Sequence, residues 1–327
     1  MAARMAPGMR GWVLKSLTSA FIQLLCQSVM LLDARTLKAM GSGGKIELES
    51  QFPRRARRRT VAHSLAMIRW FEHRQVYAPK RTLETNGSLA GRAFDEVWLT
   101  AGDGIKLHGW FFPANSGSAR ADLVLLLLHG NAGNISHRLH FYEAWLELGV
   151  NVFTFDYRGF GRSEGKPNEE GTYRDAQAAA QWLVKKGFAP NRIVALGKSL
   201  GGGVASELAL REPLGGLILQ STFTNIPDIG GELFPWLPVR WLHRIKYETI
   251  HKLPRVKVPV MIAHGRGDDL IGFHHAERNF KAANEPKLLW EIHGDHTSTI
   301  EDGREHYLAG LEKYFREYLV VPSQGRH

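Results

Sequence analysis

The chain has 327 residues, of which 44% are hydrophobic, and it carries a formal net charge of +10. This length and apolar content are enough for one large hydrophobic core. Cys26 is the only cysteine, which excludes an intrachain disulfide and, beyond this position, a cysteine nucleophile. The positive charge is concentrated in residues 1–70, which contain 12 Lys and Arg but only 3 Asp and Glu, so it does not describe the rest of the chain.

Residues 1–70 form a basic N-terminal extension. Its arginine-rich run at 54–59 is typical of a solvated linker, so no nucleic-acid partner is expected. The uncharged run at 16–32 reaches only the lower limit for a membrane span and fits an amphipathic surface helix equally well. We therefore expect this extension to be disordered or to contact a membrane surface, in a protein that is cytoplasmic or membrane-associated.

Strand-like and helix-like patterns alternate along the rest of the chain, as a mostly parallel sheet requires. The expected strands are 94–100, 105–112, 123–128, 150–156, 192–197, 216–221, 258–264 and 287–292. The expected helices are one that begins at Ser136 and those near 172–186, 200–211, 273–283 and 298–318. The first two strands are expected to form a hairpin.

Ser199 stands where an apolar strand gives way to a helix, in the sequence Gly-Lys-Ser-Leu-Gly at 197–201. Gly-x-Ser-x-Gly in this context is the nucleophile elbow, a strained turn that pushes the serine hydroxyl out of the sheet. The backbone N–H of Leu200, at the start of the helix, is expected to point at an oxyanion formed on the serine. Lys198 is interpreted as a variable position of the pattern.

A second match to the same five-residue pattern surrounds Ser163, at 161–165. It follows a strand but runs into Pro167, which indicates a loop and not a helix. We therefore interpret Ser163 as part of a loop structure and assign the nucleophile to Ser199.

Candidate partners for this serine follow two later strands. Asp268 follows the strand 258–264, and His296 follows the strand 287–292. The order Ser199, Asp268, His296 is that of the α/β-hydrolases. Two neighbouring residues are alternatives that the spacing favours less, namely Asp269 for the acid and His293 for the base. Asp228, which follows the strand 216–221, is a further alternative position for the acid.

The chain resembles the α/β-hydrolase-fold serine hydrolases, in particular their Bem46-like and depalmitoylase-like branch. The resemblance covers about residues 71–319 and rests on the segments named above and on four further motifs. These motifs are Tyr77-Ala-Pro79, the hairpin at 95–113, His-Gly-Asn-Ala-Gly-Asn at 129–134 and Asp-Tyr-Arg-Gly-Phe-Gly-Arg-Ser-Glu-Gly at 156–165.

The resemblance implies an α/β fold with a mostly parallel sheet of about eight strands, helices on both faces and a short lid. It also implies that the backbone N–H of Asn131 is the second oxyanion donor and that His129 is structural. The hydrolase domain is expected at 71–319, the tail at 320–327 and the lid at about 225–248. Three aromatic residues of the lid are candidates for substrate binding. They are Phe234, Trp236 and Trp241.

A serine nucleophile with a histidine base predicts acyl transfer through an acyl-enzyme, with a small carboxylic ester or thioester as the substrate. The alternatives are a serine peptidase or amidase of the prolyl-oligopeptidase kind, and a non-catalytic module of the same fold. No cofactor is expected. No metal is expected either, because the histidine pairs 137/140 and 274/275 lack further ligands at metal-site spacing.

Overall fold

The computed structural model describes residues 66–88, 92–235 and 243–319. The chain divides into two compact units, Met1–Val76 and Tyr77–His327. Within the first unit, residues 66–76 are helical. The predictions for the run at 16–32, the arginine-rich run and the tail at 320–327 concern residues outside the described ones. Among the helices of the described residues, none has both the length and the hydropathy needed to span a bilayer.

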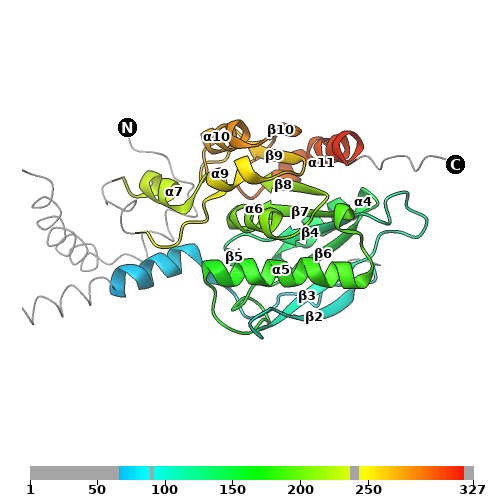
Figure 1. Ribbon diagram of the computed structural model, residues 1–327, viewed down its shortest axis with the longest axis horizontal. Helices are drawn as coiled ribbons and strands as arrows, with labels where there is room; N and C mark the ends of the chain where they lie inside the picture. The colour runs from blue at the N-terminus through cyan, green and yellow to red at the C-terminus, as the bar shows by residue number, and fades with distance from the viewer. Residues whose placement is uncertain (1–65, 89–91, 236–242, 320–327) are drawn as a thin grey trace, which may run out of the picture. The chain divides into compact units, whose positions relative to one another are not determined.

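The second unit is built on an eight-stranded sheet of order β10-β9-β8-β7-β4-β6-β3-β2 (Figure 1). Its strands are β2 (Asp95–Thr100), β3 (Lys106–Phe112), β4 (Val124–Leu128), β6 (Asn151–Phe155), β7 (Ile193–Lys198), β8 (Gly216–Gln220), β9 (Val260–Gly265) and β10 (Lys287–Ile292). β3 is antiparallel to both β2 and β6, and every other pairing is parallel. The expected sheet of about eight strands, with an opening hairpin, is confirmed.

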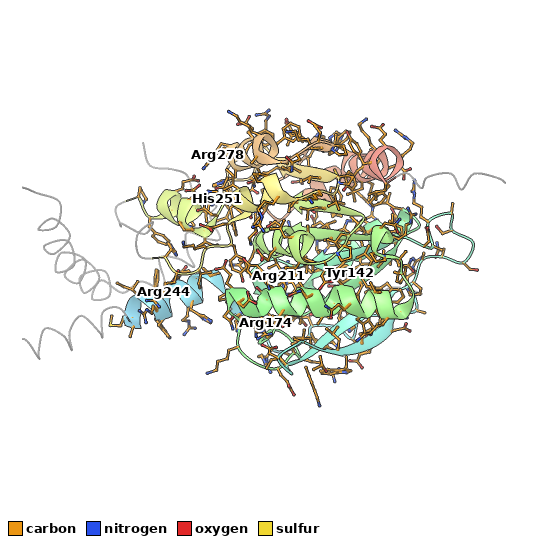
Figure 2. The ribbon with its side chains drawn as sticks, in the orientation of Figure 1. Tyr142, Arg174, Arg211, Arg244, His251 and Arg278 are labelled. Atoms are coloured by element: carbon orange, nitrogen blue, oxygen red, sulfur yellow. The ribbon has the colours of Figure 1, made fainter. Side chains whose placement is uncertain are left out.

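Helices cover both faces of this sheet. One face carries α5 (Glu169–Lys186), α6 (Leu200–Arg211), α9 (Thr249–Lys252) and α10 (His274–Ala282). The other face carries α4 (Leu139–Glu147) and α11 (Thr299–Tyr318), which pack on each other. On the outer surface, Arg211 of α6 pairs with Glu170 of α5 at 2.8 Å (Figure 2).

The apolar runs of the strands are continuous because the sheet is buried on both faces. Alternate residues face the same side, so Val194 and Leu196 of β7 join the core beneath α4 and α11. Trp145 of α4 and Tyr307 of α11 are fully buried in this core, where the indole N–H donates to the tyrosine hydroxyl at 2.9 Å.

The elements differ from expectation mainly at their ends. α5 begins three residues early, at Glu169, because the side chain of Asn168 accepts a hydrogen bond from the N–H of Gly171 at 2.8 Å and caps the helix. The helix expected from Ser136 begins with a 3-10 turn (Ile135–Arg138) and continues as α4. A two-stranded pair was not expected, and it consists of β1 (Ala78–Pro79) and β5 (Ala132–Gly133).

Candidate functional site

Ser199 lies between β7 and α6 in a backbone conformation that side chains rarely adopt, with φ 55° and ψ −119°. Glycine is needed on both sides of it. A Cβ atom built on Gly197 would lie 2.3 Å from the carbonyl oxygen of Gly201, and one built on Gly201 would lie 1.8 Å from that of Leu128. The tight strand-to-helix turn expected from the sequence is therefore present.

The structure brings Ser199, His296 and Asp268 into one hydrogen-bonded chain. His296 Nε2 lies 3.1 Å from Ser199 Oγ, and His296 Nδ1 lies 2.8 Å from Asp268 Oδ2. All three residues are buried. Since an ionised carboxylate only accepts hydrogen bonds, Nδ1 carries the imidazole proton and Nε2 is left as the acceptor that faces the serine hydroxyl.

The surroundings keep Asp268 ionised. Burial by itself opposes ionisation, but the contacts with His264 and His296 outweigh it and hold the pKa of the Asp268 carboxyl well below its usual range. The N–H groups of Leu270 and Ile271 also donate to Oδ1, at 3.1 and 2.8 Å. His264 Nε2 lies 3.4 Å from Asp268 Oδ2 and donates to the carbonyl of Ile271 at 2.7 Å, so His264 supports the loop that carries the acid.

The surroundings also keep His296 neutral. Burial lowers the pKa of His296, and the ammonium of Lys198 lowers it further, while the contact with Asp268 opposes both effects. A neutral imidazole near pH 7 can accept the proton of a serine hydroxyl, which a protonated one cannot.

The alternative acid and base lie elsewhere. Asp269 and His293 are exposed, and His293 stacks on His306 with ring centres 4.6 Å apart. Asp228 accepts a hydrogen bond from the Thr224 hydroxyl at 2.8 Å and pairs with Arg278 at 2.9 Å.

Ser163 is buried in a loop, as interpreted from the sequence. Its hydroxyl donates to the carbonyl of Asp156 at 2.6 Å and accepts the N–H of His108 at 2.9 Å. Both bonds are structural, and they occupy the hydroxyl with backbone groups.

The loop after β4 passes beside the serine. A Cβ atom on Gly130 would lie 3.5 Å from Ser199 Cβ. His129 Nδ1 donates to the carbonyl of Gly130 at 2.7 Å, and the carbonyl of Asn131 accepts the N–H of Ala78 at 2.9 Å. Because a trans peptide directs its C=O and N–H to opposite sides, the bond to Gly130 also fixes the direction of the Asn131 N–H.

His129 is buried and neutral. Burial lowers the pKa of His129 to about 3 and raises that of the neighbouring Asp156 carboxyl to about 8. His129 is therefore placed to support the loop and not to exchange protons with substrate. Leu200, the other expected backbone donor, is buried in the first turn of α6.

Lys198 is the residue whose importance the sequence interpretation missed. Its side chain is 7% exposed and turns inward, where Nζ donates to the backbone carbonyl of His296 at 2.9 Å. The sequence interpretation took it as a variable position of the pattern and gave no sign of this burial. A lysine directly before Ser199, at the end of an otherwise apolar strand, was the signal that could have indicated a buried role.

The expected lid contains α7 (Ile226–Leu233), and its C-terminal end is held by a residue of α5. Glu169 Oε2 accepts the N–H of Lys246 and Oε1 accepts that of Tyr247, both at 2.7 Å. Phe234, directly after α7, is half-buried. The other two aromatic candidates for substrate binding, Trp236 and Trp241, lie outside the described residues.

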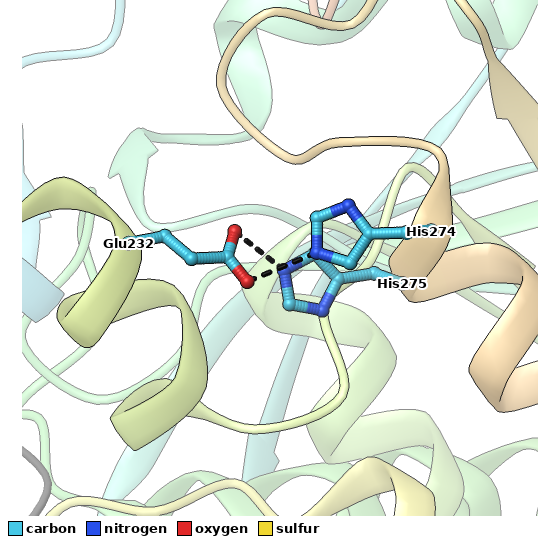
Figure 3. A group of neighbouring side chains, drawn as sticks. All are labelled: Glu232, His274 and His275. Carbon is cyan, nitrogen blue, oxygen red and sulfur yellow. Dashed lines mark hydrogen bonds and ion pairs between the residues drawn. The ribbon is translucent and has the colours of Figure 1, made fainter. Parts of the chain in front are cut away.

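Glu232 of α7 faces both His274 and His275 of α10 (Figure 3). His274 Nε2 is 2.9 Å from Glu232 Oε1, and His275 Nε2 is 3.2 Å from Glu232 Oε2. The histidine pair therefore has a third potential ligand, which the sequence spacing could not show. This corrects the argument that led to the expectation of no metal at these residues.

The hydrogen bonds of these residues form a clamp between α7 and α10. The backbone N–H of Thr224 donates to His275 Nδ1 at 3.2 Å, and the Thr224 hydroxyl donates to Asp228. The Thr224 hydroxyl also lies 3.0 Å from His275 Nδ1. His275 is thus held from both of its ring nitrogens, by Thr224 on one side and by Glu232 on the other.

A hollow of about 640 Å³ is lined by Phe94, Glu96, Trp110 and Arg162, among other residues. Its lining includes none of the three hydrogen-bonded residues and neither expected oxyanion donor. Size alone therefore does not make it the substrate site for Ser199.

Comparisons with known proteins point to one family. The model of the Hydrolase_4 family, described as serine aminopeptidase S33, matches residues 119–254. The Arabidopsis thaliana alpha/beta hydrolase domain-containing protein WAV2 is 32% identical over 290 residues, covering 79% of this chain and 92% of WAV2. Lysophosphatidylserine lipase ABHD12 of Danio rerio is 34% identical over 186 residues, covering 51% of this chain and 48% of the lipase.

The fold also matches solved structures. The Pyrococcus furiosus esterase Pf2001 superposes with a TM-score of 0.62 at 23% identity, covering 75% of this chain and 99% of the esterase. At this identity the likeness concerns the fold.

Proposed function

The chain belongs to the α/β-hydrolase family, in its Bem46-like branch, and we propose that it is a serine hydrolase that cleaves carboxylic esters or thioesters. The matching family model and the lysophosphatidylserine lipase among the relatives support hydrolase activity. The observation that carries the finer proposal is the hydrogen-bonded chain from Ser199 Oγ through His296 to Asp268, at 3.1 and 2.8 Å.

In the proposed reaction Ser199 Oγ attacks the acyl carbon while His296 Nε2 takes the hydroxyl proton. Asp268 holds the tautomer and stabilises the imidazolium that forms. His296 then gives the proton to the departing alkoxide or thiolate, leaving an acyl-enzyme on Ser199. Water hydrolyses the acyl-enzyme, again with His296 as the base.

The negative charge on the tetrahedral intermediate needs backbone donors. We assign these to the N–H groups of Asn131 and Leu200. Two features support the assignment: the loop after β4 passes within contact of Ser199, and His129 fixes the direction of the Asn131 N–H. Each donor is worth about 10²–10³ in rate in enzymes of this kind.

The short lid favours substrates with modest acyl groups. Phe234 at the end of α7, with Trp236 and Trp241 further along, would supply apolar surface to the acyl or alcohol part. Since a lysophospholipid is also a monoacyl ester and one relative is named a lysophosphatidylserine lipase, a lysophospholipid belongs in the test panel.

The test is labelling of the full chain with a fluorophosphonate, peptide mapping of the adduct, and turnover of an ester and thioester panel. We expect the label on Ser199, and we expect Ser199→Ala to lose at least about 10⁴-fold in kcat while remaining folded. Ser163→Ala is the matched control, since it changes the serine of the other Gly-x-Ser-x-Gly, and it should still react. Turnover that survives Ser199→Ala but not Ser163→Ala would overturn the assignment.

Amide hydrolysis is the second candidate, favoured by the serine aminopeptidase description of the matching family model. Fold and residue order do not distinguish amides from esters. Turnover of aminoacyl anilides without turnover of esters would favour the peptidase.

A further inference from the structure

Lys198 is a buried cation in contact with the loop that carries His296. Nζ lies 2.9 Å from the His296 carbonyl oxygen and 5.2 Å from the centre of the Phe141 ring. No carboxylate oxygen of the described residues lies within 4.0 Å of it, although a buried lysine ordinarily has such a partner. Its hydrogen bond is therefore directed at the backbone of one particular residue, the general base of the proposed function.

The His296 loop is fixed from two sides. On the exposed side, Asp295 accepts the N–H groups of Thr297 and Ser298, at 2.7 and 2.9 Å. On the buried side, Lys198 holds the carbonyl of His296 itself. Because Lys198 directly precedes Ser199, this bond ties the backbone of the base to the strand that carries the nucleophile.

We propose that Lys198 is a positioning residue, whose Nζ holds the His296 carbonyl and so keeps the imidazole aligned between Ser199 and Asp268. The inference rests on the proposed function, since alignment matters only if His296 is the base. It deepens that function by assigning the residue that sets the base's position. Misplacement of a catalytic group by about 1 Å costs about 10²-fold in rate, so the effect is measurable.

The charge of Lys198 gives the proposal a distinctive readout. The charged groups that act on it are Arg138, Asp268, Asp295 and Glu301. Burial, and to a lesser extent Arg138, lower the pKa of Lys198 to about 8, although the three carboxylates act in the opposite direction and raise it. Lys198 is thus a cation at neutral pH and becomes neutral as the pH rises through about 8, which weakens a charge-assisted hydrogen bond.

The experiment measures kcat and KM for a p-nitrophenyl ester from about pH 5 to 10 in the full chain, in Lys198→Met and in Lys198→Arg. Lys198→Met should lower kcat about tenfold or more with little change in KM, and should move the acid limb of kcat/KM to higher pH, because the cation beside His296 is gone. In the parent protein we expect kcat to fall above about pH 8, where Lys198 loses its charge. Lys198→Arg should keep most of the parent's kcat and should not show this alkaline fall, since a guanidinium stays charged.

Lys252→Met is the matched control. Lys252 is a similarly buried lysine, but Nζ pairs with Glu207 at 3.1 Å and donates to Tyr173 and Gly203, none of which touches the His296 loop. Its loss should lower stability and leave the acid limb in place, which separates positioning from loss of any buried cation.

Three results would overturn the proposal. The first is that Lys198→Met keeps the kcat and the acid limb of the parent protein. The second, which holds even if Lys198→Met fails to fold, is a Lys198→Arg variant that keeps the parent's alkaline limb. The third is that the parent protein neither hydrolyses esters nor reacts with a fluorophosphonate. This result would reject the proposed function itself, whereas the first two would reject only the role of Lys198.

Discussion

At the scale of single residues, the environment of each proposed catalytic group matches its chemical task. Asp268 is buried yet ionised, because two histidines and two backbone N–H groups surround the carboxylate. His296 is buried and neutral, which leaves Nε2 free to accept a proton. The pKa of both groups is lowered, that of Asp268 by hydrogen bonds that outweigh its burial and that of His296 chiefly by burial, so the shifts follow from the surroundings and not from the residue types.

The pH dependence tests the state of the base. Only neutral His296 can take the serine proton, so kcat/KM should fall as the pH drops through the pKa of His296. Burial and Lys198 lower this pKa, so the acid limb should lie below about 6.5, the value of an unperturbed imidazole. The measurement is kcat/KM on an uncharged ester in buffers of constant ionic strength. An acid limb centred above about pH 6.5 would contradict the lowered pKa of the assigned base.

At the scale of elements, the elbow depends on close contact between backbones. The carbonyl of Leu128 in β4 lies where a side chain at 201 would be, and only glycine leaves room for it. This contact brings the loop after β4 next to Ser199. The same glycine therefore permits the strained turn and the approach of the expected oxyanion loop.

Gly201→Ala should destabilise the fold by about 3 kcal/mol or more, because the new methyl group would meet backbone that cannot move aside. Gly102→Ala is the matched control. Gly102 has open space around its Cβ position, so the change should stay within about 0.5 kcal/mol. Urea unfolding of both variants measures the difference. Equal stabilities would show that the turn can relax.

The lid helix α7 depends on a second element, α10, for its position. Glu232 bridges to His274 and His275, and Asp228 pairs with Arg278, which Figure 2 labels on α10. These contacts explain how a helix of eight residues is fixed on the molecule, since such a short helix is marginal by itself.

Glu232→Ala should release α7 from α10. We expect faster amide hydrogen exchange in α7 and a higher KM for esters, with kcat changed less, because the lid and not the chemistry is affected. Glu277→Ala is the control, an exposed glutamate on α10 outside the clamp. Unchanged exchange in α7 would show that the clamp does not hold the lid.

At the scale of the whole molecule, the parallel sheet assembles the site. β4, β7, β9 and β10 all end at the same edge, and the segments that follow them carry the expected oxyanion loop, Ser199, Asp268 and His296. Residues nearly one hundred positions apart in the chain thus come within hydrogen-bond distance. The expected lid lies in the connection between β8 and β9, which is too short to hold a large cap domain.

This architecture predicts a preference for short and medium acyl chains. On p-nitrophenyl esters, kcat/KM should be highest for chains of modest length and decline for long ones, because a short lid encloses little apolar volume. A kcat/KM that rises steadily up to very long chains, with no turnover of short ones, would contradict this prediction. Lysophospholipid turnover measured beside the series shows whether a headgroup changes the preference.

The sequence alone determined most of the fold and the order of the site. The alternation of strand and helix patterns, the elbow glycines and the strand-end positions of Asp268 and His296 are local features, written in a few consecutive residues each. They predicted the eight-stranded sheet correctly, with most errors at helix ends such as that of α5, where a side chain of Asn168 decides the boundary.

The tertiary structure decided what depends on distant neighbours. It separated His296 from His293 and Asp268 from Asp269 by burial, joined Glu232 to two histidines over forty residues away, and turned Lys198 inward to His296. Burial, ionisation and hydrogen-bond partners are set by packing between elements, and no local pattern encodes them.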